Sequence, residues 1–332
     1  MLADALAPPP STLVGDVLPR VRNAVRRVLA PWQPQRASAR AQATAGERLL
    51  CDAIALLTGE PLTRAALYLR ASDAGNRAFQ ADFDALAAAD RRVRERRIAT
   101  VDLPQEAELD LALAGLGRPL VLACVHAGPY LGGLLRLLPL LPGARRLTLI
   151  RRPAACAREV ALCAHLGALG VDTQVLRLAE RPLLPALQAL RDGRAVLTMI
   201  DVPPSFWPAE AQARGVRQAL MATSLLGHTA WLPEGPAALA VAASAVVLPV
   251  HCSGSPRASC LRLGPLVDAA RGDGESRAAA TARVHHALAR QFEDWLRSAP
   301  ADWLLWRHLP AFFVAGEEGA RERRGAISRA PP

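Results

Sequence analysis

The stretch PLVLACVHAG, residues 119–128, decides the fold expected for this 332-residue chain. It is a short, continuous apolar run between a proline and a glycine, which is typical of a strand buried on both faces of a sheet. Such strands belong to parallel sheets, in which ligands bind beyond the carboxyl ends of the strands. The pattern therefore predicts that His126 is delivered to the functional edge of a parallel sheet.

Apolar runs of the same kind alternate with helical patterns after this stretch. Strands are expected over 145–153, 171–178, 194–203 and 245–254, and helices over 131–141, 154–169, 183–193, 235–244 and 281–296. A longer loop is expected between the strand that ends at 203 and the helix that begins at 235. The order predicts a single α/β domain of layered architecture, with a central, largely parallel sheet flanked by helices.

Helices are also expected before the sheet, over 47–59, 62–72 and 78–97. The first 45 residues form a flexible lead whose segment 17–32 has apolar residues at helical spacing with arginines between them. That segment suits either contact with a membrane surface or packing on the domain as a solvated helix. The predicted domain covers 46–314, and the charged residues 315–332 are expected to form a disordered tail.

The composition is basic, with a formal net charge of +10 and no lysine. This charge favours anionic partners such as phospholipid headgroups or phosphopantetheine carriers. Nucleic acid is not expected as a partner, because no zinc spacing or RNA-binding aromatic motif is present. No signal peptide is expected, and no uncharged apolar run reaches the ~18 residues of a spanning helix. The six cysteines form no CxxC pair and predict free thiols without a metal site.

Polar residues follow several of the expected strands: His126, Arg151, Arg152 and Asp201. Imidazole titrates near neutral pH and suits a general base that takes a proton from a hydroxyl group. The two arginines suit phosphate, which guanidinium groups bind through forked hydrogen bonds. Each of these residues also has a structural alternative, as a core histidine, a solvated surface charge or a turn residue.

Two neighbours of His126 are further candidates for contact with substrate. Gly128 would let a substrate approach the backbone closely, and Tyr130 could donate a hydrogen bond to a carbonyl oxygen or simply pack.

Four segments in order resemble the lipid A lauroyl/myristoyl acyltransferase family of the lysophospholipid acyltransferase superfamily. They are VHAGPYLGGLLRL (125–137), TMIDVP (198–203), LLGHTAWLPEGPAALAVAASAVVLPV (225–250) and FEDWLRSAPADWLLWRH (292–308). The resemblance implies transfer of a fatty acyl chain from acyl carrier protein or coenzyme A to a lipid or glycolipid. It also implies a bacterial protein at the cytoplasmic face of the inner membrane or in the cytoplasm, without a cofactor.

The resemblance also implies a histidine with an acid five residues later, but here that position is Leu131. Asp201 and Glu234 are the candidate replacement acids, and LPEGPA around Glu234 and Gly235 is similar to the Pro-Glu-Gly motif of the glycerol-phosphate acyltransferase branch. His228 lies in the same family-like segment and is a candidate substrate contact.

Two alternatives to catalysis by His126 with a substitute acid stay open. In the first, the reaction needs no acid; in the second, the chain is a degenerate relative that binds a lipid or acyl carrier. An α/β hydrolase is disfavoured because no Gly-x-Ser-x-Gly motif is present. His285 and His286 are expected at the surface of the last long helix.

Overall fold

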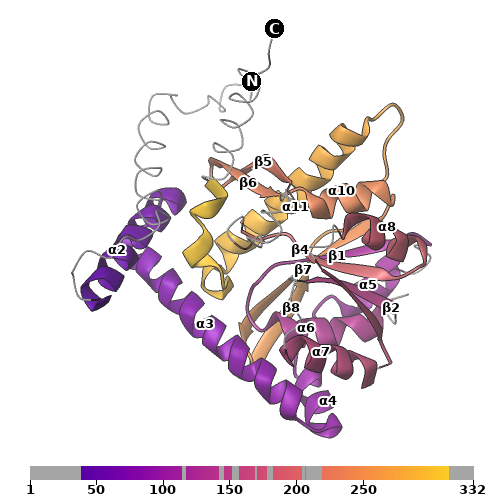
Figure 1. Ribbon diagram of the computed structural model, residues 1–332, viewed down its shortest axis with the longest axis horizontal. Coiled ribbons are helices and arrows are strands. Elements are labelled where there is room, and N and C mark those ends of the chain that lie inside the picture. Colours follow the sequence, from indigo (N-terminus) through magenta and orange to yellow (C-terminus); the bar gives the residue numbers. More distant parts are fainter. Residues whose placement is uncertain are drawn as a thin grey trace, which may run out of the picture.

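The computed structural model describes residues 39–113, 117–141, 146–151, 157–168, 170–177, 182–203, 206 and 219–313. They form a central sheet with helices on both faces, as Figure 1 shows. The helices are α2 (Ala39–Thr58), α3 (Leu62–Ala88), α4 (Arg91–Ala99), α5 (Glu106–Leu113), α6 (Tyr130–Leu137), α7 (Ala157–Ala168), α8 (Leu183–Arg191), α10 (Gly235–Ala242) and α11 (Arg277–Ser298). The strands are β1 (Leu120–Cys124), β2 (Arg146–Arg151), β3 (Asp172–Arg177), β4 (Ala195–Met199), β5 (Leu220–Leu225), β6 (His228–Pro233), β7 (Val246–Ser255), β8 (Ala258–Leu263) and β9 (Val267–Asp268).

The central sheet has the strand order β3-β2-β4-β1-β7-β8, and β9 also pairs with β7. The first five strands of this order run parallel to one another, whereas β8 and β9 run antiparallel to β7. From β1 the chain moves outward to β2 and β3, then returns to place β4 beside β1. The predicted α/β fold with a largely parallel sheet is therefore confirmed.

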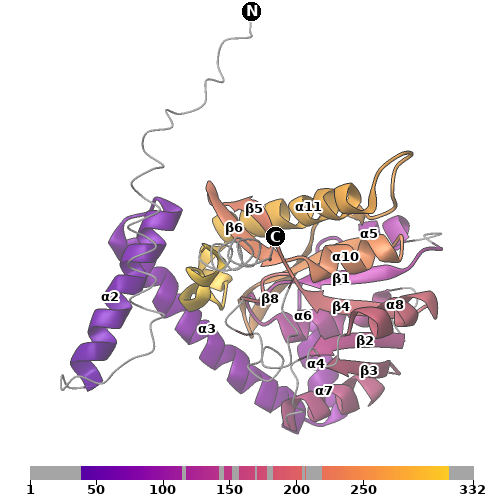
Figure 2. The same ribbon diagram turned by 45° about the horizontal axis from the view of Figure 1, so that its top comes forward.

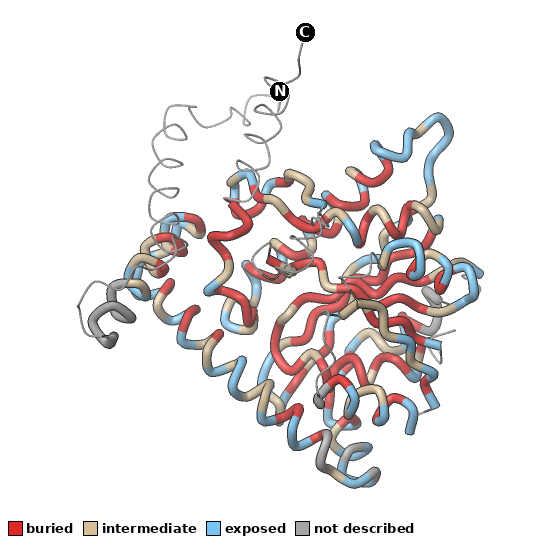
Figure 3. The backbone as a smooth tube through the Cα atoms, in the orientation of Figure 1, coloured by how far each residue is buried: buried red, intermediate tan, exposed pale blue. Residues whose placement is uncertain are grey.

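Side chains of β1 alternate between two hydrophobic cores, one on each face of the sheet. Val121 and Ala123 pack in a core with residues of α8, α10 and α11. Leu122 and Cys124 pack on the other face with residues of α6 and α7. Figure 3 shows that buried residues are concentrated along the strands of the central sheet. Each large apolar side chain buried in this way stabilises the fold by about 1.5–3 kcal/mol. Because both faces of these strands are buried, their sequences are continuous apolar runs.

The helices before the sheet differ from the prediction, since α3 is one continuous helix where two were expected. Its turn-like residues make long-range contacts instead of ending the helix. Ser72 Oγ and Asn76 Nδ2 both donate to the carbonyl oxygen of Leu304, over 2.8 and 2.7 Å. Gly75 lies against the Leu304 side chain, where a Cβ atom would approach Cδ2 to 2.8 Å. Tertiary contacts therefore override a local pattern that favours a break.

A second difference is the hairpin of β5 and β6, which occupies part of the stretch expected to be a loop. Its turn is formed by Leu226 and Gly227, which both have positive φ angles, 55° and 79°. The hairpin packs on α11, as Figure 2 shows. His285 lies under it and is buried, so the expectation of a surface position for His285 was wrong, whereas His286 is exposed.

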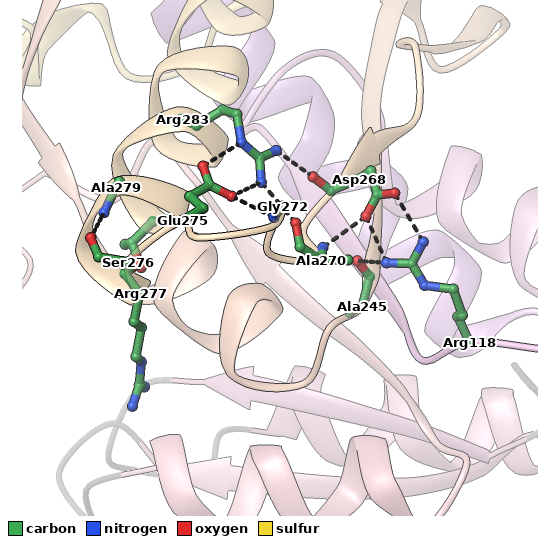
Figure 4. A network of polar contacts seen from close by, with 11 residues as sticks. Arg118, Ala245, Asp268, Ala270, Gly272, Glu275, Ser276, Arg277, Ala279 and Arg283 are labelled. Atoms are coloured by element: carbon green, nitrogen blue, oxygen red, sulfur yellow. Dashed lines mark hydrogen bonds and ion pairs between the residues drawn. The ribbon is translucent and has the colours of Figure 1, made fainter.

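Ion pairs at the amino end of β1 and β7, opposite His126, join distant parts of the chain (Figure 4). Arg118 donates to the carboxylate of Asp268 over 2.7 Å and lowers the pKa of that group to about 2. Arg283 binds Glu275, whose pKa is likewise lowered to about 2, and also the backbone carbonyl of Asp268. These contacts tie β9 and the start of α11 to the segment that leads into β1.

Residues 1–38 of the N-terminal lead, with the basic segment 17–32, and the C-terminal stretch 315–332 lie outside the described residues. Helix α2 begins at Ala39, inside the predicted lead. Among the helices of the described ranges, none is both long enough and apolar enough to cross a bilayer.

Candidate active site

Strand pairing brings His126 and Asp201 together. In the register of β1 and β4, Cys124 faces Met199, and the backbone N–H of Ile200 donates to the carbonyl of Cys124 over 2.9 Å. His126 and Asp201 each follow two residues after this last pair, at adjacent strand ends. After β1 the chain continues into α6 on one face of the sheet, whereas after β4 it continues toward α10 on the opposite face. The two residues thus flank a topological switch point, the usual ligand site of such sheets.

Asp201 holds His126 through two hydrogen bonds. Its Oδ1 lies 2.8 Å from His126 Nδ1, and its Oδ2 accepts the backbone N–H of His126 over 2.8 Å. Because a carboxylate oxygen only accepts, this contact in a neutral imidazole assigns the ring proton to Nδ1 and the lone pair to Nε2. Asp201 is fully buried, whereas the His126 side chain is 21% exposed. The imidazole therefore turns Nε2 away from Asp201 and remains accessible from outside.

A segment after α11 closes over the same strand ends. The indole nitrogen of Trp303 donates to Asp201 Oδ2 over 2.9 Å, and Trp303 is buried. The backbone N–H of Leu304 donates to the carbonyl of His126 over 2.8 Å, and the N–H of Gly128 donates to the carbonyl of Asp302 over 2.8 Å. The segment 302–304 therefore fixes both partners of the His126–Asp201 pair from one side.

Leu131, five residues after His126, is part of the hydrophobic core. Leu131 is 7% exposed and packs in the hydrophobic cluster beneath α6. A carboxylate at this place would be buried among apolar side chains unless the helix shifted. The structure therefore places an acid beside His126 from a neighbouring strand instead of from the following helix.

Tyr130 and Gly128 both lie beside His126. The Tyr130 ring makes an edge contact with the imidazole at a centroid distance of 5.7 Å and stacks on Phe79 of α3 at 4.6 Å. Gly128 has a φ of +51°, and a Cβ atom there would lie 2.7 Å from the carbonyl oxygen of Cys252. Gly128 is thus required for the close packing of the His126 loop on β7, whatever its relation to a substrate.

Arg151 ends β2, two strands from β1 in the order of the sheet, and part of its charge is already compensated. Its Nε lies 3.7 Å from Glu159, which is buried and also receives two hydrogen bonds from Arg177 at the end of β3. The three groups carry a net charge of +1, and the Arg151 side chain is 34% exposed. Arg152 lies outside the described residues.

The remaining predicted residues cluster around the β5–β6 hairpin. Glu234 precedes α10, its backbone N–H donates to the carbonyl of Ala219, and its side chain makes no capping bond. No contact found in the described ranges joins it to His126. His228 makes an edge contact with Phe313 at 6.2 Å, and burial lowers the pKa of its imidazole. Gly235 begins α10, and a Cβ atom there would meet no neighbour within 4 Å.

Three residues near the site were not predicted from the sequence. Trp303 donates to Asp201, and Arg177 donates to Glu159 beside Arg151. His251, in β7, is buried and stacks on Trp295 at 5.1 Å. The available signals were the Trp-x-x-Trp spacing of Trp303 and Trp306 and the position of Arg177 at the end of β3, whereas His251 lies inside β7 and gave no such signal. Within the described residues, no group of three or more His, Cys, Asp or Glu side chains could hold a metal ion.

No protein-family model matches this chain. The chain is similar to the phosphatidylinositol mannoside acyltransferases of two Mycobacterium tuberculosis strains, CDC 1551 / Oshkosh and H37Rv, with 29% identity over 136 residues. It is also similar to that of Mycolicibacterium smegmatis, with 27% identity over 136 residues. These matches cover 41% of this chain and 37–38% of the relatives, so the chain spans little more than a third of their length. The similarity supports a distant relationship of this chain to lipid acyltransferases.

Proposed function

We propose that this protein transfers a fatty acyl chain from an acyl thioester, carried by acyl carrier protein or coenzyme A, to a hydroxyl group of a lipid or glycolipid. The observation that supports this best is the contact of His126 Nδ1 with the buried carboxylate of Asp201 over 2.8 Å. Asp201 supplies the partner acid that Leu131, five residues after His126, cannot supply. The acyltransferase relatives support the same reaction class.

In the proposed reaction, His126 Nε2 accepts the proton of the acceptor hydroxyl group as its oxygen attacks the thioester carbonyl. The carbonyl π electrons move to oxygen and a tetrahedral intermediate forms. When the carbonyl reforms, the carbon–sulfur bond breaks and the sulfur takes the proton from Nε2. The products are an ester and a free thiol. Asp201 stabilises the transient imidazolium and keeps the ring proton on Nδ1.

The other residues have subsidiary roles in this proposal. Tyr130 lies against the imidazole and lines the approach of the carbonyl, with Gly128 beneath it. Arg151, with Arg152, provides positive charge for a phosphate group on the acceptor or donor. Glu234, Gly235 and His228 are assigned to the acceptor side, around the β5–β6 hairpin.

The proposed location is the membrane surface, where lipid acceptors lie. The basic composition favours peripheral contact with the cytoplasmic face of a bacterial inner membrane, since anionic headgroups attract arginine. Transfer to lipid A itself, with a lauroyl or myristoyl chain, is the finer form of this proposal. It rests on the four ordered segments alone.

The test is acyl transfer by the full chain, with acyl-carrier-protein and coenzyme A thioesters as donors and with lipid A precursors and phosphatidylinositol mannosides as acceptors. The matched variant is His126→Gln, which keeps a polar side chain but lacks a basic ring nitrogen. We expect ester formation by the wild type and a loss of about a thousandfold or more in the variant. Transfer that persists in the variant would reject His126 as the base. Binding of donor or acceptor without any transfer would instead favour a catalytically inactive relative.

A further inference from the structure

A groove of about 510 Å³ between α3, α4 and the β7–β8 turn is not used by the mechanism above. The small side chains on one face of α3 form its floor, and residues of α4 and of the β7–β8 turn form its sides. The lining includes Ala78, Ala81, Ala85, Asp82, Arg97 and Arg257. The volume falls within the range of roughly 300–1,000 Å³ that is usual for small-molecule sites.

The groove opens at the same edge of the sheet as His126. Strand β7 runs parallel to β1 and continues for five residues beyond Val250, which pairs with Cys124. At a rise of about 3.3 Å per residue, its tip therefore projects past the level of His126. Gly254, next to that tip, donates its backbone N–H to Asp302, the residue that also binds the His126 loop.

Aromatic contacts join the imidazole to α3, the helix that lines the groove. His126 contacts the edge of Tyr130, and Tyr130 stacks on Phe79. Phe79 is outside the lining, but it adjoins in sequence Ala78, the first lining residue of α3. From Ala78 the lining follows α3 to Ala89. This is about 16 Å of helix at a rise of 1.5 Å per residue. The groove thus suits a narrow, extended chain.

The charge in the groove is positive. Asp82 is buried and accepts a hydrogen bond from Nη2 of Arg97, while the Arg97 side chain remains 33% exposed. This pairing fixes the guanidinium and leaves its other N–H donors for a second acceptor. Arg257 is exposed at the two-residue tip of the β7–β8 turn, and no ion pair of Arg257 is found within the described ranges. Two guanidinium groups and one carboxylate give the groove a net charge of +1.

We propose that this groove binds the phosphopantetheine arm of the acyl donor. The small side chains of α3 accommodate the arm, the thioester end lies near His126, and the phosphate accepts hydrogen bonds from Arg257 and Arg97. Guanidinium groups bind phosphate in this way through charge-assisted hydrogen bonds. The inference deepens the proposed acyl transfer and rests on it for the identity of the donor.

The experiment measures binding of 4′-phosphopantetheine and of pantetheine to the full chain by calorimetry. The two probes differ only in the phosphate. We expect the phosphate to tighten binding about tenfold or more in the wild type, since hydrogen bonds to charged groups are worth that much. Arg257→Gln leaves Arg97 in place, so it should reduce this preference several-fold and leave the affinity for pantetheine unchanged. Equal affinities of the wild type for the two probes, or a preference in Arg257→Gln as large as in the wild type, would overturn the proposal.

A second pair of variants tests the groove itself. Ala85→Leu fills the exposed floor of the groove and should weaken binding of both probes several-fold. Ala74→Leu adds the same side chain to an exposed position of α3 outside the lining, and should change neither affinity. Equal effects of the two variants would overturn the location. Because binding is measured without turnover, absence of acyl transfer would reject the proposed function separately from this subsite.

Discussion

The indole N–H of Trp303 and the backbone N–H of His126 donate to the same oxygen of Asp201, over 2.9 and 2.8 Å. The other oxygen of Asp201 faces Nδ1 of the imidazole over 2.8 Å. The carboxylate is therefore fixed by three N–H groups in a buried setting, and its orientation determines that of the His126 ring. A residue more than a hundred positions away in the sequence is thus positioned to influence the proposed base.

Trp303→Phe keeps the aromatic packing but removes one of these three donors. We expect kcat for acyl transfer to fall about tenfold, with little change in KM, because Asp201 loses a charge-assisted hydrogen bond. The matched control is Trp306→Phe, which removes the indole bond to the carbonyl of Pro300 in the same aromatic cluster. Steady-state kinetics and thermal unfolding of both variants would separate the two roles. Similar losses of kcat in both would show that Trp303 acts only through packing.

The two candidate acids can be separated by substitution. Asp201→Asn should lower kcat by about a thousandfold or more, because the amide cannot hold the ring in the required tautomer. Glu234→Gln should lower kcat by less than about tenfold, the range of a group that does not orient the base. Kinetics at saturating donor and acceptor, with circular dichroism to confirm folding, would decide between them. A larger loss in Glu234→Gln than in Asp201→Asn would reverse the assignment.

The glycine beside His126 provides a stability test with an internal reference. Gly128→Ala forces a positive φ on alanine and brings Cβ to 2.7 Å from the Cys252 carbonyl oxygen. Gly59→Ala has a similar φ, +71°, but open space around Cβ. We expect a loss of about 1 kcal/mol for Gly59→Ala from backbone strain alone, and about 1–3 kcal/mol more for Gly128→Ala. Urea unfolding would measure both, and equal losses would contradict the packing role of Gly128.

The strands around the site were predictable because burial on both faces leaves continuous apolar runs, as in Leu120–Cys124. The β5–β6 hairpin was not, because its turn places Leu226 where an asparagine or aspartate usually signals positive φ. Asp201 was a candidate from its place at a strand end, and the pairing of β1 with β4 now puts it against His126. Trp303 could not be assigned this contact, because nothing local shows that the segment after α11 returns to the sheet.

Two buried histidines predict how stability depends on pH. Burial lowers the pKa of His251 to about 4, assisted by the positive charge of Arg262 and opposed by Asp201. Burial likewise lowers the pKa of His285 to about 4, assisted by His286 and opposed by backbone groups of Met221 and Pro233. In the unfolded chain both rings take up protons near pH 6.5.

Since the unfolded state binds more protons between pH 6.5 and 4, the free energy of unfolding should decrease as the pH falls through this window. Each histidine contributes a slope of up to about 1.4 kcal/mol per pH unit. Urea unfolding between pH 5 and 7 lies above the range in which Asp268 and Glu275 titrate. His228, whose pKa is also lowered by burial, adds to the slope in the same direction. His285→Gln and His251→Gln should each flatten the slope, while His286→Gln, at an exposed position on the same helix, should flatten it much less. A slope that stays the same in the double variant His251→Gln/His285→Gln would show that other groups carry the pH dependence.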